Sequence, residues 1–331
     1  MKKRILLTKP FFGKDLEYIK SGLSSEAEII IPENFELETL IALAKDADVF
    51  LGPNLSPELL ANAKKLELIQ IPWTGVDKLE LSNLEGYDFV LCNSHSNSLA
   101  VAEHSVALAL ALLKKIPYHH DELTRGNWNR PKPDASNVVS PFSVSLKGLK
   151  VGLLGYGSIA KKIHKLLLGF DCDFYVCSKS QKKFDKEQNV TESFVLEDVD
   201  DFLGKIELLF VCLPLTTETN KLLDHSKLSL LKNGYLINTA RGEVIEEKAL
   251  FELLSDKVIK GAAIDTWNGT IKDGQKPSPF EFEKLNNVIL SSHRAGMIEG
   301  SLPHLDDAIT NVNNLCNGFP LINIVDINKK Y

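Results

Sequence analysis

The chain has 331 residues, of which 44% are hydrophobic and 25% charged, so it can build two hydrophobic cores of ordinary domain size. Its formal net charge of −6 argues against a nucleic-acid partner, because affinity for a phosphate backbone needs clustered Lys and Arg. Five cysteines without a Cys-x-x-Cys pair predict neither a zinc site nor a disulfide framework. We expect reduced, buried thiols, a cytoplasmic location and no metal site.

The N-terminal segment, Met1–Leu7, opens with basic residues, but its apolar run ends at Thr8 and is far too short for a signal peptide. We interpret this segment as a first strand. Nowhere does the chain approach the roughly 18 consecutive apolar residues that a membrane-spanning helix requires. No membrane association is therefore expected.

Short apolar runs alternate with longer helical patterns, which is the order that a parallel sheet with crossover helices requires. The fold class is therefore α/β. Ser56 is expected to cap one of the first helices, with Pro57 in its first turn. In the first part of the chain, strands are predicted at Ile5–Leu7, Glu28–Ile31, Val49–Leu51, Leu68–Ile71 and Phe89–Cys92.

The segment Leu99–Lys115 is apolar on most faces and rich in Ala and Leu, which predicts a buried helix that crosses between domains. A loop rich in Pro, Asn and Ser follows at 127–145, and a second α/β unit begins after it. The last helix, from about Gly300 to Asn317, has no sheet of its own to cover, so it is expected to return to the first domain. Strands of the second unit are predicted at Val151–Leu154, Phe174–Cys177, Leu208–Cys212, Leu236–Asn238, Ala262–Asp265 and Val288–Leu290.

A glycine-rich string, GYGSIA at 155–160, follows the first strand of the second unit and opens the helical run Ser158–Leu168. This context favours a dinucleotide site. Gly155 permits the tight turn, Gly157 lets the backbone approach a pyrophosphate, and Ala160 keeps the helix close to the strand. The N–H groups that begin the helix, at Ser158 and Ile159, would face the phosphates. A tight turn without a ligand is the alternative.

The residues after the next strand, Phe174–Cys177, indicate which dinucleotide is preferred. A carboxylate at this point normally pairs with the ribose hydroxyls of NAD. Ser178 and Lys179 stand there instead, and a hydroxyl and a cation suit a 2′-phosphate. NADP is therefore predicted to be preferred over NAD, the alternative being a solvated basic loop.

Several longer segments carry a family resemblance. They are Thr74–Asp77, Val101–His104, Leu213–Asn220 and Ile237–Gly242, together with Asp265 and His293. Over nearly its whole length the chain resembles the D-isomer-specific 2-hydroxyacid dehydrogenases, which include glyoxylate/hydroxypyruvate reductases and phosphoglycerate dehydrogenases. The resemblance implies two Rossmann-like or flavodoxin-like domains with parallel sheets. A dinucleotide-binding domain, 99–294, would be inserted into a substrate domain made of 1–98 and 295–331.

The resemblance also implies roles for individual residues. His293 matches the family's acid/base residue, and Arg241 matches the arginine that grips the substrate carboxylate and polarises the neighbouring carbonyl. Asp265 would accept a hydrogen bond from the nicotinamide carboxamide. Backbone N–H groups of Thr74, Gly75 and Val76 would hold the other end of the carboxylate, and the cofactor would be lined by Leu213, Pro214, Thr219, Thr239 and Ala240. Without these motifs, His293 could equally be a capped surface histidine, and Arg241 an ion-pair partner of Glu243 or Glu246.

The chain departs from the family beside the histidine. The glutamate that usually stands five residues beyond the aspartate is replaced by Thr270, which removes an interaction that favours the imidazolium form of His293. We therefore expect weaker or more acid-shifted activity than in a member with the glutamate. The proline usually found before the histidine is Ser292, and Arg294 follows it. The nearest polar substitutes for the glutamate are Asp273, Gln275, Glu281 and Glu283.

Two functions are compatible with these residues. The first is reduction of a small 2-oxo acid, such as glyoxylate or hydroxypyruvate, with NADPH. The second is an NAD(P)-binding regulatory or sensor protein that has lost efficient chemistry. A phosphoglycerate-type substrate is less favoured, because the loops near Pro53-Asn54 and Pro72-Trp73 hold no arginine and Trp73 suggests an apolar wall. A homodimer is expected, because Leu99–Leu113 and Arg125–Trp128 resemble the family's dimer-forming segments.

Overall fold

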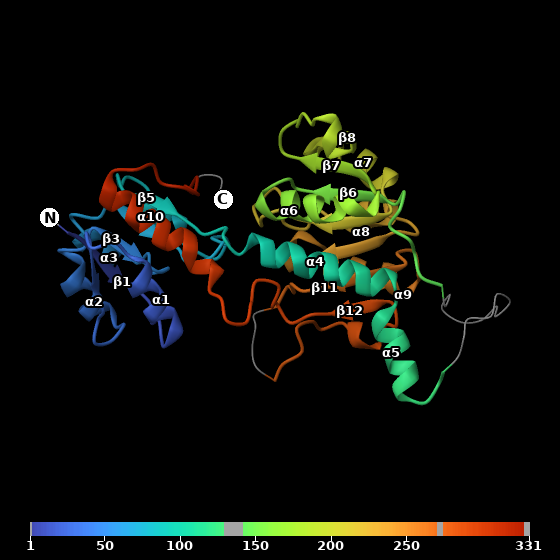
Figure 1. Ribbon diagram of the computed structural model, residues 1–331, viewed down its shortest axis with the longest axis horizontal. Coiled ribbons are helices and arrows are strands. Elements are labelled where there is room, and N and C mark those ends of the chain that lie inside the picture. The colour runs from blue at the N-terminus through green and yellow to red at the C-terminus, as the bar shows by residue number, and fades with distance from the viewer. Residues whose placement is uncertain (1, 129–141, 270–273, 328–331) are drawn as a thin grey trace. The chain divides into compact units, whose positions relative to one another are not determined.

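The computed structural model describes residues 2–128, 142–269 and 274–327. The chain divides into two compact units, one formed by Met1–Asn97 with Ile298–Tyr331 and the other by Ser98–Met297. Each unit contains one sheet in which all the strand pairs described are parallel (Figure 1). This is the predicted α/β class, with one doubly wound unit interrupted in sequence by the other.

The first unit has a five-stranded sheet in the order β2-β1-β3-β4-β5. This is the flavodoxin-like order. All five predicted strands are present, and their ends shift by no more than two residues. The strands are β1 (Lys3–Leu7), β2 (Ala27–Ile30), β3 (Val49–Leu51), β4 (Leu68–Gln70) and β5 (Val90–Cys92).

Alternating side chains along β1 show how both faces of this sheet are covered. Ile5 and Leu7 pack in the core beneath α1 (Lys14–Gly22) and α10 (Asp306–Asn317). Leu6 points to the opposite core, beneath α2 (Leu37–Ala44) and α3 (Pro57–Asn62). The last helix therefore packs on the first sheet, as α10, in red, shows in Figure 1. It begins at Asp306 rather than near Gly300, because the chain first makes a 3-10 turn, η7 (Pro303–Leu305).

The expected cap of α3 is wrong in its chemistry. Ser56 stands at the N-cap position and Pro57 begins the helix, but the Ser56 hydroxyl makes no capping hydrogen bond. Instead, the Ser56 N–H donates to the side chain of Asn54 at 3.2 Å. This turn organises the entry to the helix and leaves the serine hydroxyl buried, with no partner among the described residues.

The second unit has a seven-stranded sheet in the order β12-β11-β10-β9-β6-β7-β8. This is the Rossmann order with one further strand beyond β11. The six predicted strands are present, but β8 was not predicted, because its residues mix polar and apolar types at an exposed edge. The strands are β6 (Lys150–Leu154), β7 (Asp173–Ser178), β8 (Val190–Val195), β9 (Leu208–Val211), β10 (Tyr235–Asn238), β11 (Gly261–Ile264) and β12 (Val288–Leu290).

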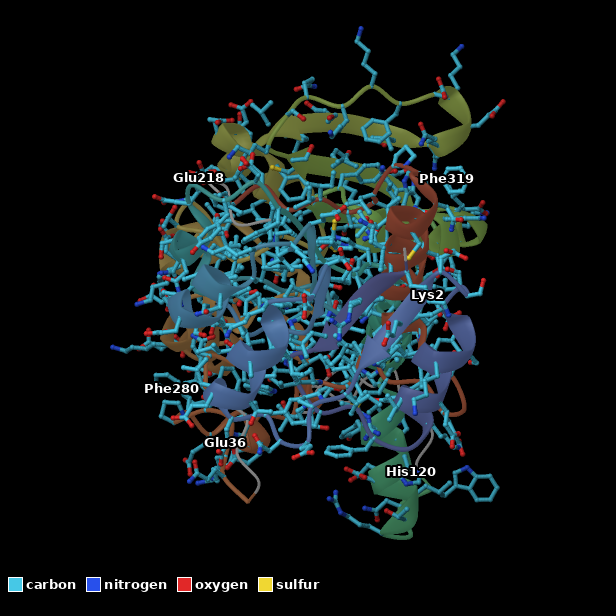
Figure 2. The ribbon with its side chains drawn as sticks, turned by 90° about the vertical axis from the view of Figure 1, so that its left-hand side faces the viewer. Lys2, Glu36, His120, Glu218, Phe280 and Phe319 are labelled. Carbon is cyan, nitrogen blue, oxygen red and sulfur yellow. The ribbon has the colours of Figure 1, made fainter. Side chains whose placement is uncertain are left out.

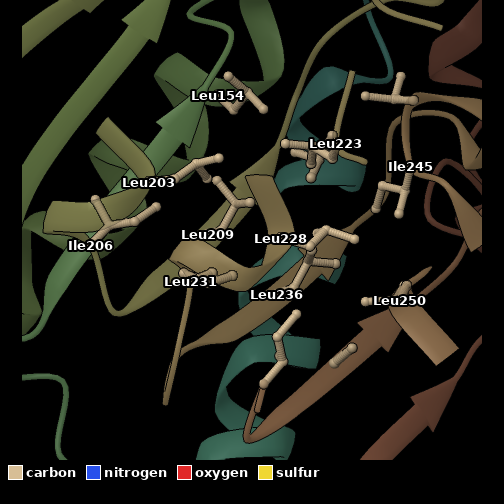
Figure 3. Close-up of a cluster of buried hydrophobic side chains, with 14 of the residues drawn as sticks. Leu154, Leu203, Ile206, Leu209, Leu223, Leu228, Leu231, Leu236, Ile245 and Leu250 are labelled. Atoms are coloured by element: carbon tan, nitrogen blue, oxygen red, sulfur yellow. The ribbon is translucent and has the colours of Figure 1, made fainter. Parts of the chain in front are cut away.

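Two helical layers cover the second sheet. On one face lie α4 (Ser98–Leu113) and α6 (Ser158–Leu167), with their own apolar core. On the other lie α7 (Val199–Lys205), α8 (His225–Leu230) and α9 (Glu247–Ser255). Figure 3 shows this second core, where strand residues such as Leu209 and Leu236 meet helix residues such as Leu203 and Leu250.

The helix predicted at 99–115 is present as α4, but it is shorter than predicted and lies wholly within the second unit. Lys115 has a left-handed backbone (φ 54°), which ends the helical path of α4. A separate helix, α5 (Ile116–Thr124), follows, and none of its residues is buried. In Figure 2 the helix that carries His120 stands out from its unit.

Three features hold for the described part of the chain as a whole. None of its helices combines the length and the low polarity needed to cross a membrane. No group of three His, Cys, Asp or Glu side chains is arranged to hold a metal ion. All five cysteines are free, and burial raises the pKa of Cys92 and of Cys177 to about 12, so these two thiols stay protonated and unreactive.

Candidate active site

The strand register brings the candidate residues of the second unit to one edge of its sheet. Leu154, Val211, Asn238, Ile264 and Leu290 are paired in succession from β6 to β12. The segments that follow these strands therefore leave the sheet side by side. Arg241 follows β10, Asp265 directly follows β11 and His293 follows β12. The backbones that carry Arg241 and His293 therefore start about 10 Å apart, two strand spacings.

The glycine-rich turn after β6 needs glycine at its first position. Gly155 has φ 91°, and a Cβ there would lie 2.7 Å from the carbonyl oxygen of Cys212. At Gly157, the N-cap of α6, a Cβ would meet no atom within 4 Å. Open space therefore lies over this backbone, beside the first N–H groups of the helix at Ser158 and Ile159. A pyrophosphate fits this cradle.

A buried histidine supports the same turn from within. His164, on α6, is 3% exposed, and its Nδ1 lies 2.7 Å from the hydroxyl of Tyr156. Its Nε2 lies 2.7 Å from the carbonyl oxygen of Gln188. Because a carbonyl only accepts, Nε2 carries the proton and Nδ1 accepts from the tyrosine. Burial lowers the pKa of His164, and the smaller effect of the Gln188 hydrogen bond opposes it.

This histidine should make stability depend on pH. Below the ordinary histidine pKa of about 6.5, His164 takes up a proton in the unfolded chain but stays neutral in the fold. The free energy of unfolding should then fall as pH drops below that value, by at most about 1.4 kcal/mol per pH unit. Urea unfolding between pH 5 and 7.5, pH values chosen to bracket about 6.5, should show a shallower slope in His164→Gln. The exposed control, His225→Gln, should keep the wild-type slope; equal slopes in all three proteins would contradict the expectation.

The loop after β9 is closed by its own threonine. Thr219 is buried, its hydroxyl donates to the carbonyl of Pro214 at 2.6 Å, and it accepts the N–H of Thr216 at 2.8 Å. Its hydroxyl is therefore used within the loop. Leu213 is buried and Pro214 exposed, so these two residues offer an apolar surface at the sheet edge.

The turn that carries Arg241 is fixed by a residue that sequence reasoning missed. Asn238, 1% exposed, accepts the N–H of Ala240 at 3.1 Å and donates to the carbonyl of Arg241 at 3.0 Å. The Thr239 hydroxyl pairs with Ser105 of α4 at 2.8 Å. Arg241 itself is half-buried, and its Nη1 donates to the Ala240 carbonyl at 2.8 Å. An amide at the end of an apolar strand was the available signal.

Asp265 holds the segment that carries His293. Its carboxylate is 1% exposed and accepts hydrogen bonds from the Ser291 hydroxyl and from the N–H groups of Arg294 and Ala295, the latter two at 3.1 Å. Its carbonyl accepts the N–H of His293 at 2.9 Å. These bonds fix an exposed histidine whose backbone is left-handed, with φ 52°.

A second histidine joins this network from α4. The Nε2 of His104 lies 3.1 Å from the Ser291 hydroxyl and 3.7 Å from the Asp265 carboxylate. Because Ser291 donates its proton to Asp265, its oxygen is free to accept from His104. Sequence reasoning did not place His104 here, because it is far from Asp265 along the chain.

Ser178 and Lys179 lie at the end of β7, as predicted, but both already have partners. Ser178 is buried, and its hydroxyl donates to the carbonyl of Ser180 at 2.9 Å. The Lys179 ammonium lies 2.8 Å from the carboxylate of Glu218, which Figure 2 labels at the surface. Both side chains of this pair are more than half exposed, so the pair is weak and exchangeable.

In the first unit, the loop after β4 offers unpaired donors. The Thr74 hydroxyl donates to the carbonyl of Ser94 at 2.7 Å, and Asn93 donates to the carbonyl of Thr74 at 2.7 Å. These bonds hold the loop at the carboxyl edge of its sheet. Within the described residues, nothing accepts from the N–H groups of Gly75 and Val76. Two donors in sequence suit a carboxylate.

The position of the family glutamate, Thr270, lies outside the described residues, as does Asp273. Among the other substitutes considered, Gln275 is exposed. Glu281 pairs with Lys284 at 2.6 Å, and Glu283 pairs with Lys276. These exposed ion pairs satisfy the two glutamates at the surface.

Comparison with known proteins decides the family. Residues 106–295 match the model of the NAD-binding domain of the D-isomer specific 2-hydroxyacid dehydrogenases. The chain belongs to this family. It is accordingly an NAD(P)-dependent oxidoreductase that acts on the CH–OH group of 2-hydroxy acids, with the two-domain Rossmann-like fold.

Relatives of the dehydrogenase match it along most of its length. A glyoxylate/hydroxypyruvate reductase of Arabidopsis thaliana is 28% identical over 98% of this chain and 97% of its own length. A D-3-phosphoglycerate dehydrogenase of Methanocaldococcus jannaschii is 26% identical over 89% of this chain, but the match spans only 54% of that protein. The crystal structure of a protein from Pyrococcus horikoshii OT3 superposes with a TM-score of 0.77 at 26% identity, covering 98% and 96% of the two chains.

Proposed function

We propose that this dehydrogenase reduces a small 2-oxo acid, such as glyoxylate or hydroxypyruvate, to the 2-hydroxy acid. The observation that carries the proposal is the common sheet edge on which the glycine-rich turn, Arg241, Asp265 and His293 emerge in register. A relative named glyoxylate/hydroxypyruvate reductase, matched almost end to end, supports this substrate class. A nicotinamide dinucleotide on the glycine-rich turn supplies the hydride.

The residues of the chain divide the remaining work. The Arg241 guanidinium grips the substrate carboxylate with two parallel N–H donors and polarises the adjacent carbonyl. The imidazole of His293 gives its proton to the carbonyl oxygen as negative charge develops there. On the first unit, the N–H groups of Thr74, Gly75 and Val76 are the proposed donors to a substrate carboxylate. Asp265 contributes by holding the loop of His293.

We assign cofactor contacts to the same edge of the second unit. The N–H groups that follow Gly157, at Ser158 and Ile159, bind the pyrophosphate, and Gly155 keeps the turn tight. The apolar wall for the cofactor is formed by Leu213, Pro214 and Ala240, while the hydroxyls of Thr219 and Thr239 shape the loops that carry it.

A panel of 2-oxo acids, assayed with NADPH and with NADH by loss of nicotinamide absorbance, tests the function. Turnover of at least one small 2-oxo acid is expected. Tight cofactor binding, measured by fluorescence, without turnover of any of them would instead favour a regulatory or sensor protein.

The preference for NADP over NAD is also proposed. No carboxylate ends β7, and the Lys179 ammonium can leave its exposed partner Glu218 for a 2′-phosphate. In Lys179→Ala, kcat/KM with NADPH should fall about tenfold, the loss of one charge-assisted contact, while the value with NADH stays unchanged. Glu218→Gln should raise the value with NADPH. The control Lys205→Ala removes another exposed, paired lysine and should change neither. A wild type that prefers NADH would overturn this proposal.

We propose a homodimer, formed through the surface that α5 presents. Its apolar side chains Ile116 and Leu123 are 56% and 59% exposed, and Trp128, just beyond it, is 84% exposed. An apolar surface of this kind typically marks an interface. Light scattering coupled to size exclusion should give a dimer for the wild type and a monomer for Leu123→Asp. Leu230→Asp, at a 41% exposed position on α8, is the control and should remain dimeric; a monomeric wild type would refute the proposal.

A further inference from the structure

The ammonium group of Lys9 lies at the carboxyl edge of the first sheet. Lys9 follows β1, and the ends of β1, β3 and β4 are paired in register through Leu7, Leu51 and Gln70. The Thr8 N–H donates to the Leu51 carbonyl at 3.0 Å. The loops that carry Lys9 and Thr74 therefore leave the same edge.

Three neighbours fix the Lys9 side chain. Its Nζ lies 4.8 Å from the centre of the Phe11 ring and 5.2 Å from that of Trp73. Gly52, with φ 137°, makes room for its stem, since a Cβ there would lie 3.1 Å from Lys9 Cγ and 2.5 Å from the Thr8 hydroxyl. Aromatic faces attract a cation without neutralising its charge. The ammonium is thus held in place by groups that carry no negative charge.

Among the described residues, Lys9 also lacks an anionic partner. Within the described ranges, no carboxylate lies within ion-pair distance of its Nζ, whereas Lys3, Lys65 and Lys205 each have one. The positive charge of Lys9 also acts on His304. Burial is the main cause that lowers the pKa of this histidine; the charge of Asp15 raises the pKa, and that of Lys9 lowers it further. Lys9 is therefore a positioned cation that no anionic group of the described residues neutralises.

We propose that Lys9 binds a second negative group of the substrate, a carboxylate or a phosphate remote from the reacting carbonyl. This inference rests on the proposed function, in which the N–H groups of Thr74, Gly75 and Val76 take the first carboxylate. Trp73 directly precedes those donors, and its ring lies beside the Lys9 ammonium. The side chain that the sequence suggested as an apolar wall against a phosphorylated substrate therefore also positions a cation. A dianionic 2-oxo acid engages both sets of donors, while a neutral side chain leaves the ammonium without a partner.

Matched substrates test the proposal. The wild type should show at least about tenfold higher kcat/KM for 2-oxoglutarate or 3-phosphohydroxypyruvate than for 2-oxobutyrate, the gain expected of a charge-assisted contact. The dicarboxylate and the phosphorylated acid distinguish the two sources of charge. Lys9→Met should lower the values for the dianions by about 10- to 100-fold and change the value for 2-oxobutyrate by less than about threefold. Lys9→Arg should retain most of the preference.

A binding measurement separates this proposal from the function itself. Quenching of tryptophan fluorescence by malonate, with acetate as the monoanionic reference, should weaken in Lys9→Met and persist in the control Lys20→Met, an exposed lysine on α1. If the wild type reduces monoanionic and dianionic acids equally well, or if Lys9→Met treats both alike, the subsite is refuted while the function stands. If no 2-oxo acid is reduced although malonate binding depends on Lys9, the function fails instead.

Discussion

Replacing His293 by Asn should lower kcat for 2-oxo acid reduction by about 10²- to 10⁴-fold, the usual contribution of a positioned acid. Asparagine is the suitable substitute, because the backbone at this position is left-handed with φ 52°, a conformation that Asn tolerates well. KM for the cofactor should hardly change. Steady-state kinetics with saturating cofactor measures the effect.

The control is His225→Asn, an exposed histidine at the start of α8, which should leave kcat unchanged. A His293→Asn enzyme that keeps more than about a tenth of the wild-type kcat would exclude this histidine as the acid. The resemblance implies Thr270 at the position of the family glutamate, so we expect the wild-type rate of reduction to decline on the acid side of neutrality as pH rises. A rate sustained well above neutral pH would show that another group supports the imidazolium.

Replacing Arg241 by Lys should lower kcat/KM for 2-oxo acids by about 10²- to 10³-fold, even though the positive charge is retained. The reason is geometric, since a lysine cannot supply the two parallel donors of a guanidinium. Arg241→Ala should lower kcat/KM still further. Because Asn238 binds the backbone on both sides of Arg241, the turn itself should survive either change.

Arg294→Lys is the matched control, since Arg294 is an exposed arginine next to His293. Its kcat/KM should stay within about threefold of the wild type, as for most surface substitutions. Cofactor affinity, measured separately by fluorescence titration, should be the same in the wild type, Arg241→Lys and Arg294→Lys. An Arg241→Lys enzyme with wild-type kcat/KM would show that the carboxylate is held elsewhere.

Much of the fold follows from short-range patterns. Apolar runs such as Ile5–Leu7 and Val151–Leu154 are buried on both faces, so they stand out from the helices between them. β8 does not stand out, because Val190–Val195 is an edge strand with exposed Thr191 and Glu192. α5 was missed because its start depends on one left-handed residue, Lys115, which is not a residue type typical of that conformation.

The candidate site, like the fold, could be predicted from the sequence only in part. Gly155, Arg241, Asp265 and His293 could be placed at one edge, because each follows a recognisable parallel strand. The residues that hold the site in place, or extend it, could not be placed from the sequence. His104 reaches Ser291 across 187 positions, and Lys9 meets Trp73 only through folding. Contacts of this range depend on helix placement and side-chain direction, which no local pattern records.

The network around Asp265 has a consequence for movement. The chain passes between its two units at 97–98 and at 297–298. His104 follows the first of these points closely, and Ser291, Arg294 and Ala295 come shortly before the second. All four residues lie around the buried carboxylate of Asp265. Bending within these stretches would strip hydrogen bonds from a desolvated anion, which is costly. The turn of α4 that carries His104 and the segment from Ser291 to Ala295 are thereby held together, within the second unit, around the group that orients His293.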